Sequence, residues 1–244
     1  MPAWARRTLV TGASRPLGVE IVRQCLERGD HVIAAARNPA RVPVLADLRA
    51  KYGGLDLVAL DPAEAASVAQ AMPVLEQITE SLDLLIVAPA EPGPHDRVSD
   101  AARDAALETL SATALVEHYR RHAVAPVLLV RTLLPMLQAA GQSRVLLVNS
   151  WLASLAGKTQ GGDYAQCASG AAYNMLARAL AYDVATCNVI VGIGNPGKFA
   201  TTPERSPMSV PIDESVAGLL RVIEGLPAER AGEFVDWTGA GREW

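Results

Sequence analysis

The chain has 244 residues, half of them apolar and a fifth charged, and its formal net charge is −4. This composition is typical of one well-buried globular domain, and the acidic balance argues against nucleic acid as a partner. Cys25, Cys167 and Cys187 are too few and too scattered for a disulfide framework or a zinc site, so we expect no metal. The N-terminal residues lack a signal-peptide apolar region, and the longest apolar runs are of strand length. We therefore expect a cytoplasmic protein with no membrane partner.

Apolar runs of strand length alternate with longer amphipathic segments from one end of the chain to the other. Strands are predicted at residues 8–11, 31–36, 55–60, 82–88, 143–149, 188–193 and 233–237. Helices are predicted at 17–28, 41–52, 64–80, 99–110, 113–140, 163–186 and 213–224. Strands this uniformly apolar are typical of a sheet covered on both faces. The alternation predicts one α/β domain over residues 1–244, a Rossmann-like, doubly wound parallel sheet of about seven strands.

A glycine-rich turn joins the first predicted strand to the first predicted helix. It reads Gly12-Ala13-Ser14-Arg15-Pro16-Leu17-Gly18. Such a turn presents backbone N–H groups at a helix N-terminus, where a dinucleotide's pyrophosphate can bind, with Gly12, Ser14, Arg15, Leu17 and Gly18 as candidates. A tight turn that binds nothing is the alternative. Pro16 suits the first position of a helix, but it removes one N–H that could face a phosphate.

Arg15 in this turn and Arg37 at the end of the second strand are placed to pair with an adenosine 2′-phosphate. Because a guanidinium there favours the phosphorylated cofactor, NADP(H) is the candidate cofactor rather than NAD. For Arg37, a solvated surface charge is the alternative. The long segment without periodicity at 198–212 is a candidate lid beside a ligand cleft.

The spacing of the turn resembles the Thr-Gly-x-x-x-Gly-x-Gly pattern of the short-chain dehydrogenase/reductase family, with Pro16 in place of the middle glycine. The resemblance extends over residues 7–244 and is nearest the branch of the C-factor and Sniffer-type carbonyl reductases, through 161–164, 213–218 and 232–239. It implies that Asp61 lies against the adenine and that Pro196, Gly197 and Thr201 cover the nicotinamide.

The family's catalytic set is an asparagine, a serine, a tyrosine and a lysine. The resemblance places Ser150 and Tyr164 at the serine and tyrosine positions, His122 at the asparagine and Ala168 at the lysine. Four residues apart on a helix, Tyr164 and Ala168 share one face. A lysine there would hold the nicotinamide ribose and help to ionise the tyrosine, and an alanine does neither. Lys158, in the preceding loop, is an alternative source of the cation.

The departures from the family pattern concentrate on the dinucleotide side, at Pro16, residues 87–90 and Ala168. The substrate-side pair, Ser150 and Tyr164, is kept. Since hydride transfer needs the nicotinamide held in place, this pattern favours acid–base chemistry without net redox, such as isomerisation, cyclisation or dehydration.

The expected substrate is a small molecule of secondary-metabolite type that carries a carbonyl or enol. Ser150 and Tyr164 would donate hydrogen bonds to its oxygen, and His122 would be the base or relay.

Trp151, Ala90 and Phe199 are the candidate lining of the substrate pocket, although a core position is an alternative for Trp151. Two other functions stay open: an NADPH-dependent carbonyl reductase with an altered tetrad, and a non-catalytic binding or regulatory protein. The helices at 113–140 and 163–186 have alanine- and leucine-rich faces, which makes a homodimer a further expectation.

Overall fold

The computed structural model describes residues 6–88, 107–199 and 210–244. One sheet of seven parallel strands runs through it in the order β3-β2-β1-β4-β5-β6-β7. The strands are β1 (Arg7–Thr11), β2 (His31–Ala36), β3 (Leu55–Ala59), β4 (Leu84–Val87), β5 (Ser143–Val148), β6 (Val189–Asn195) and β7 (Phe234–Asp236). The predicted parallel α/β sheet is therefore confirmed, strand by strand.

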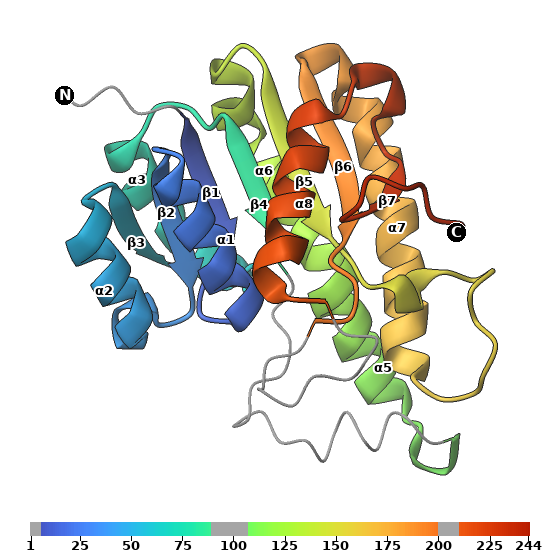
Figure 1. Cartoon of the computed structure of the whole chain (residues 1–244). Coiled ribbons are helices and arrows are strands. Elements are labelled where there is room, and N and C mark those ends of the chain that lie inside the picture. Colours follow the sequence, from blue (N-terminus) through green and yellow to red (C-terminus); the bar gives the residue numbers. More distant parts are fainter. Residues whose placement is uncertain (1–5, 89–106, 200–209) are drawn as a thin grey trace.

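Helices cover both faces of the sheet (Figure 1). They are α1 (Pro16–Glu27), α2 (Pro43–Tyr52), α3 (Ala65–Ile78), α5 (Ala112–Tyr119), α6 (Ala125–Ala139), α7 (Tyr164–Val184) and α8 (Ile212–Gly225). A π-helical turn, Arg120–Val124, joins α5 to α6, so the two form the single run predicted at 113–140. The segment predicted as a helix at 99–110 and the candidate lid at 198–212 fall mostly outside the described residues. Ala90 and Thr201 also lie outside them.

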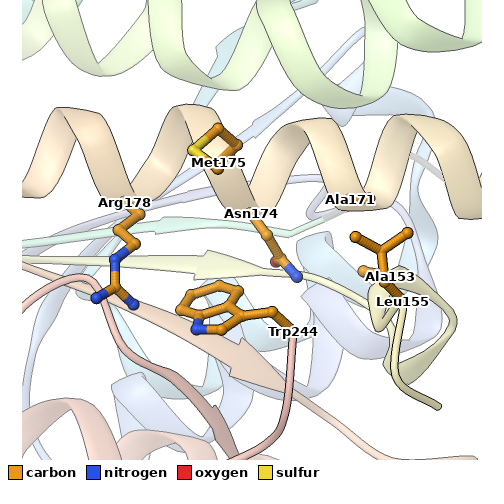
Figure 2. A pocket seen from close by; sticks show the side chains of 7 residues that line it. All are labelled: Ala153, Leu155, Ala171, Asn174, Met175, Arg178 and Trp244. Carbon is orange, nitrogen blue, oxygen red and sulfur yellow. The ribbon is translucent and has the colours of Figure 1, made fainter.

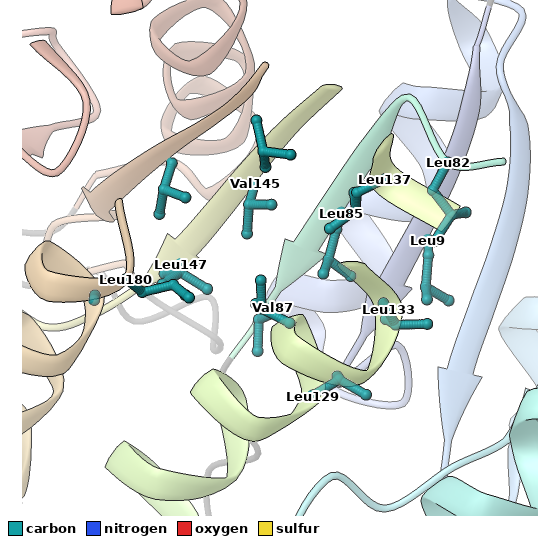
Figure 3. Packing of buried hydrophobic residues seen from close by; sticks show 14 of the residues in the cluster. Leu9, Leu82, Leu85, Val87, Leu129, Leu133, Leu137, Val145, Leu147 and Leu180 are labelled. Carbon is teal, nitrogen blue, oxygen red and sulfur yellow. The ribbon is translucent and has the colours of Figure 1, made fainter. Parts of the chain in front are cut away.

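The run Ala112–Ala139 is long and apolar enough to cross a membrane by length and composition, which the shorter apolar runs of the sequence had not suggested. In the fold its second half packs on the sheet. Leu129, Leu133 and Leu137 are fully buried against Leu9 and Leu85 of the strands (Figure 3). This packing is that of a core helix, which passes the same test of length and composition.

Two apolar clusters, one on each face, hold the layers together. One packs α3, α6 and α7 on the sheet, and the other packs α1, α2 and α8 on the opposite face. The carboxyl ends of β1, β4, β5 and β6 meet at one edge, and the strand order reverses direction between β1 and β4. Ligands of open parallel sheets bind at such an edge.

The glycine turn after β1 depends on two very close backbone contacts. Gly12 has a left-handed φ of +65°, and a Cβ there would lie 2.9 Å from the carbonyl oxygen of Ala88. Gly18, in the first turn of α1, lies so close to Gly12 that an added Cβ would overlap the Gly12 carbonyl. Side chains are excluded at both positions, so the close approach of α1 to β1 explains the glycines without any ligand.

Gly18→Ala should therefore lower the free energy of unfolding by about 2 kcal/mol, since overpacking a tight contact commonly costs about 1–3 kcal/mol. Gly225→Ala is the matched control, because Gly225 also lies in a helix and no atom is within 4 Å of its added Cβ. The control should be neutral or stabilising by up to about 1 kcal/mol. Urea unfolding measures both, and equal effects of the two substitutions would contradict this packing.

Candidate active site

The start of α1 offers backbone N–H groups that the N-cap side chain does not cap. Pro16 occupies the first helical position, as predicted, and the side chain of Arg15 at the N-cap makes no capping hydrogen bond. Ser14 is exposed beside it. These features fit a phosphate at the helix N-terminus. Leu17 and Gly18 are buried beneath the turn, and their predicted part in cofactor binding stays a prediction.

The turn is also tied to the end of β2. The Ala13 N–H donates to the Ala35 carbonyl oxygen at 3.2 Å. Arg37 follows β2 as an exposed residue, so it lies on the same edge of the sheet as Arg15. This neighbourhood of the two arginines and the glycine turn fits the adenosine half of NADP(H).

Asp61 follows β3, and the chain itself engages its carboxylate. Oδ1 accepts from the Ala63 N–H at 3.0 Å, and Oδ2 lies 3.6 Å from a guanidinium nitrogen of Arg121. An adenine at this position would have to share the carboxylate with Arg121, a residue that the sequence had not singled out. The predicted contact between Asp61 and adenine stays a prediction.

Ser150 lies at the carboxyl end of β5, where it caps the short 3₁₀ turn Trp151–Ala153. Its N–H donates to Asn149 Oδ1 at 2.8 Å, and its Oγ accepts from the Leu152 N–H at 3.2 Å. Because Oγ is used there as an acceptor, its proton is left to donate to another oxygen. Ser150 is thus well placed to polarise a substrate carbonyl.

Asn195, the last residue of β6, holds the neighbouring loops together and had not been recognised from the sequence. Its Oδ1 accepts from the N–H groups of Trp151 at 3.1 Å and Gly197 at 3.2 Å. Ser215 Oγ donates to the Pro196 carbonyl at 2.6 Å. Pro196 and Gly197 therefore have structural partners at the predicted edge, fixed relative to the turn that carries Ser150.

The two described residues of the candidate substrate pocket differ in their surroundings. Trp151 is 41% exposed, so the alternative of a core tryptophan is wrong and its ring is available beside Ser150. Phe199 is half-buried and packs against the apolar cluster under α1 and α8.

Helix α7 presents a different face to the site than the sequence had suggested. With about 100° between successive residues of an α-helix, Tyr164 and Ala168 lie within about 40° of each other, as predicted. Ser169, Gly170 and Tyr173 are among the buried residues of α7, and these three lie about 120° or more around the helix from Tyr164. Ala168 is exposed. The predicted pair therefore points largely away from the sheet.

The position that Ala168 was expected to fill belongs, by this geometry, to Gly170. A Cβ at Gly170 would lie 2.9 Å from Ala153 Cβ and 3.5 Å from Asn149 Oδ1, directly against the Ser150 turn. One helical turn earlier on the same face stands Gln166. The pair that faces the site is therefore Gln166 and Gly170. The expectation that Tyr164 and Ala168 face Ser150 is wrong, because α7 is rotated about its axis relative to the predicted orientation.

Lys158 does not supply the missing cation in this arrangement. Its side chain is exposed, and Nζ donates to the Gly162 carbonyl at 2.8 Å, within the loop that leads into α7. This hydrogen bond stabilises the loop before α7.

Two histidines converge on α7 from the neighbouring helical run. Nδ1 of His118 and Nδ1 of His122 each lie 2.8 Å from Ser169 Oγ, and the two rings are 5.4 Å apart, edge to face. The single proton of a hydroxyl satisfies only one Nδ1 acceptor, so at least one imidazole donates its own Nδ1–H. The three groups form a path along which a proton can pass from one ring to the other. His118 and Ser169 had not been recognised, although the four-residue spacing of His118 and His122 is a readable signal.

His122 is kept neutral by its surroundings. Burial, together with repulsion from His118, lowers its pKa from 6.5 to about 4. Its ring also packs 5.6 Å from the ring of Tyr173, which is fully buried. At neutral pH this imidazole is therefore an uncharged hydrogen-bonding group.

The depressed pKa of His122 predicts a pH-dependent stability. Below about pH 6.5 the unfolded chain takes up a proton that the folded chain resists until about pH 4, so the free energy of unfolding falls as the pH drops through this window. The loss attributable to His122 is on the order of 3 kcal/mol. His122→Asn should make the profile between pH 6.5 and 4 shallower in urea titrations.

His31→Asn is the control, because it removes a histidine from β2 that lies outside the cluster and pairs with Asp56. It should leave the His122 contribution in place. Parallel profiles for the wild type and His122→Asn would show that His122 is not held neutral.

Among the described residues, no three histidine, cysteine, aspartate or glutamate side chains are grouped to hold a metal ion.

Comparison with known proteins decides the family. Residues 6–209 match the model of the short chain dehydrogenases. The chain belongs to this family. It is 35% identical to C-signal of Myxococcus xanthus over 123 residues, which are 50% of this chain and 74% of that protein. Its fold superposes on an NADPH-bound carbonyl reductase from chicken fatty liver with a TM-score of 0.86, at 26% identity over 99% of this chain and 100% of the other.

A third relative of this short-chain dehydrogenase is the 1-hydroxy-2-glutathionyl-2-methyl-3-butene dehydrogenase of a Rhodococcus strain, 27% identical over 97% of this chain and 98% of that protein. The predicted family and the neighbourhood of the C-factor and carbonyl reductases are confirmed. Two of these three are oxidoreductases by name, the carbonyl reductase and the Rhodococcus dehydrogenase. The feature to be explained is therefore the glutamine and glycine, Gln166 and Gly170, on the inner face of α7, which is the face toward the Ser150 turn.

Proposed function

We propose that this protein is an acid–base catalyst of the short-chain dehydrogenase fold, which acts on the carbonyl or enol of a small molecule without net oxidation or reduction. The observation that carries the proposal is the inner face of α7. It directs Gln166 and Gly170 toward the Ser150 turn, where hydride transfer would need an acid and a cation. Ser169, on the same helix, is hydrogen-bonded to both His118 and His122.

In this proposal Ser150 and His122 act on the same substrate, and consecutive residues of α7 link the segments that carry them. Asn149, next to Ser150, donates to the Gly170 carbonyl at 2.9 Å, whereas His122 bonds to Ser169, the preceding residue. Ser150 donates its hydroxyl proton as a hydrogen bond to the substrate oxygen. His122, neutral at pH 7, accepts a proton from the adjacent carbon, and Ser169 relays it to His118. The proton returns to a different atom, so atoms and charge balance without a redox partner.

The dinucleotide site fits only in part. The uncapped start of α1 and the nearby arginines suit the pyrophosphate and adenosine half, whereas the inner face of α7 supplies no cation for the nicotinamide ribose. NADP(H) supplies a hydride in the reductases this chain resembles. Here we assign it at most a binding role, and no step is routed through it.

Proton exchange in the absence of nucleotide tests the proposal. Acetone, cyclohexanone and acetophenone in D₂O should lose their α-proton NMR signals at least tenfold faster with the protein than in buffer. Ser150→Ala should slow the catalysed exchange about 10²-fold, as expected for loss of a hydrogen bond to developing oxygen charge. His122→Asn should slow it by a similar factor, as expected for loss of a general base.

Thr186→Ala is the matched control, because Thr186 is an exposed hydroxyl residue beyond the far end of α7, and its exchange rate should equal that of the wild type. Exchange that appears only after NADPH is added, with loss of absorbance at 340 nm, would contradict the proposal. That outcome would favour the second candidate, an NADPH-dependent carbonyl reductase, which the likeness to the NADPH-bound chicken enzyme supports.

A further inference from the structure

A second pocket lies along α7, outside the proposed catalytic groups. It has a volume of about 410 Å³ and lies between α7, the turn after β5 and Trp244 (Figure 2). Its lining residues are Ala153, Leu155, Ala171, Asn174, Met175, Arg178 and Trp244. A cavity of this size accommodates a small organic molecule.

The floor of the pocket carries a hydrogen-bond donor without a partner. Asn174 is 2% exposed, and its Nδ2 makes no hydrogen bond to any residue that the structure describes. Its orientation is fixed, because Asn174 Oδ1 accepts from Asn149 Nδ2 at 2.7 Å while Asn149 Oδ1 is used by the Ser150 N–H. Figure 2 shows the amide nitrogen of Asn174 on the side of Trp244 and Leu155. A buried donor left unpaired is costly, and a ligand oxygen here would satisfy it.

The rim of the pocket carries the positive charge of Arg178. The guanidinium of Arg178 lies 5.0 Å from the centre of the Trp244 ring and 3.4 Å from the hydroxyl of Tyr182. Within the described residues it forms no ion pair with an acidic side chain. Figure 2 shows that the side chains of Arg178 and Asn174 both extend from α7 toward the Trp244 indole. The two donors therefore point to a ligand with an anionic oxygen group.

The remaining walls are apolar. Leu155 is 75% exposed and Met175 67% exposed, unusually bare for large apolar side chains that flank one cavity. The Trp244 indole is held in place by stacking on Phe234, with 6.0 Å between ring centres, and by a hydrogen bond of 2.8 Å from the Ala156 N–H to its carbonyl. A ligand would cover Leu155 and Met175 with a hydrocarbon body.

We propose that this pocket binds a small amphiphilic carboxylate, an aliphatic or aromatic acid whose carboxylate pairs with Arg178 and Asn174 Nδ2 and whose apolar body covers Leu155 and Met175. The site is separate from the proposed reaction, and its binding needs neither nucleotide nor ketone. It is linked to the catalytic turn, however. Asn174 Oδ1 accepts a hydrogen bond from Asn149 Nδ2, and Asn149 Oδ1 accepts one from the Ser150 N–H. An acid bound to Asn174 therefore restrains the turn that positions Ser150.

Isothermal titration of the full chain with decanoate tests the site. Decanoate should bind at least tenfold more tightly than 1-decanol, which has the same chain without the charge. Arg178→Gln should weaken decanoate binding at least tenfold, and Arg178→Lys should weaken it less. Arg221→Gln, an exposed arginine on α8 at the opposite face of the sheet, is the matched control and should bind as the wild type does.

Hydrogen exchange supplies the second readout. Saturating decanoate should slow amide exchange in a peptide that spans residues 149–156, and Asn174→Leu should abolish this protection. Equal affinity for decanoate and 1-decanol, an unchanged affinity in Arg178→Gln, or unaltered exchange at 149–156 would each overturn the proposal. So would a dimer that dissociates on adding decanoate, because a second copy would then occupy this face.

Discussion

The close approach of α7 to the turn after β5 is the contact on which the site depends. Gly170 leaves no room for a side chain, because its added Cβ would lie 2.9 Å from Ala153 Cβ. This contact, together with the hydrogen bond from Asn149 to the Gly170 carbonyl, fixes the rotation of α7 about its axis. This rotation determines whether each side chain of α7 faces the sheet, the two histidines or the outer surface.

Three consequences follow from this rotation. Ser169 is hydrogen-bonded to His118 and His122, and these contacts are the proton path that we propose. Ala168 faces outward, so it is not the substitution that removes a cation from the site. Asn174 turns its Oδ1 to Asn149 and leaves its Nδ2 for the second pocket. One helix thus separates a candidate catalytic face from a candidate binding face, with Asn149 joined to both.

Much of the fold followed from the sequence, because apolar periodicity and glycine spacing are local signals. The seven strands, Pro16 as the first residue of α1 and Ser150 at the end of β5 are examples. The rotation of α7 about its axis could not be predicted from the sequence. Tyr164 and Ala168 matched the spacing of the family motif, but the contact that sets the rotation joins Gly170 to Ala153, 17 residues apart. The bonds of Ser169 to two histidines and of Asn195 to Trp151 are likewise tertiary, and no local pattern encodes them.

The most direct test is to rebuild the inner face of α7 and follow NADPH oxidation at 340 nm with benzaldehyde. The combined substitution Ala153→Gly, Gln166→Tyr and Gly170→Lys makes room beside the Ser150 turn and places an acid and a cation there. We expect no NADPH consumption by the wild type and measurable reduction by the triple variant. A wild type that oxidises NADPH at a comparable rate, and loses that activity in Tyr164→Phe, would contradict the assignment of Tyr164 to the outer face.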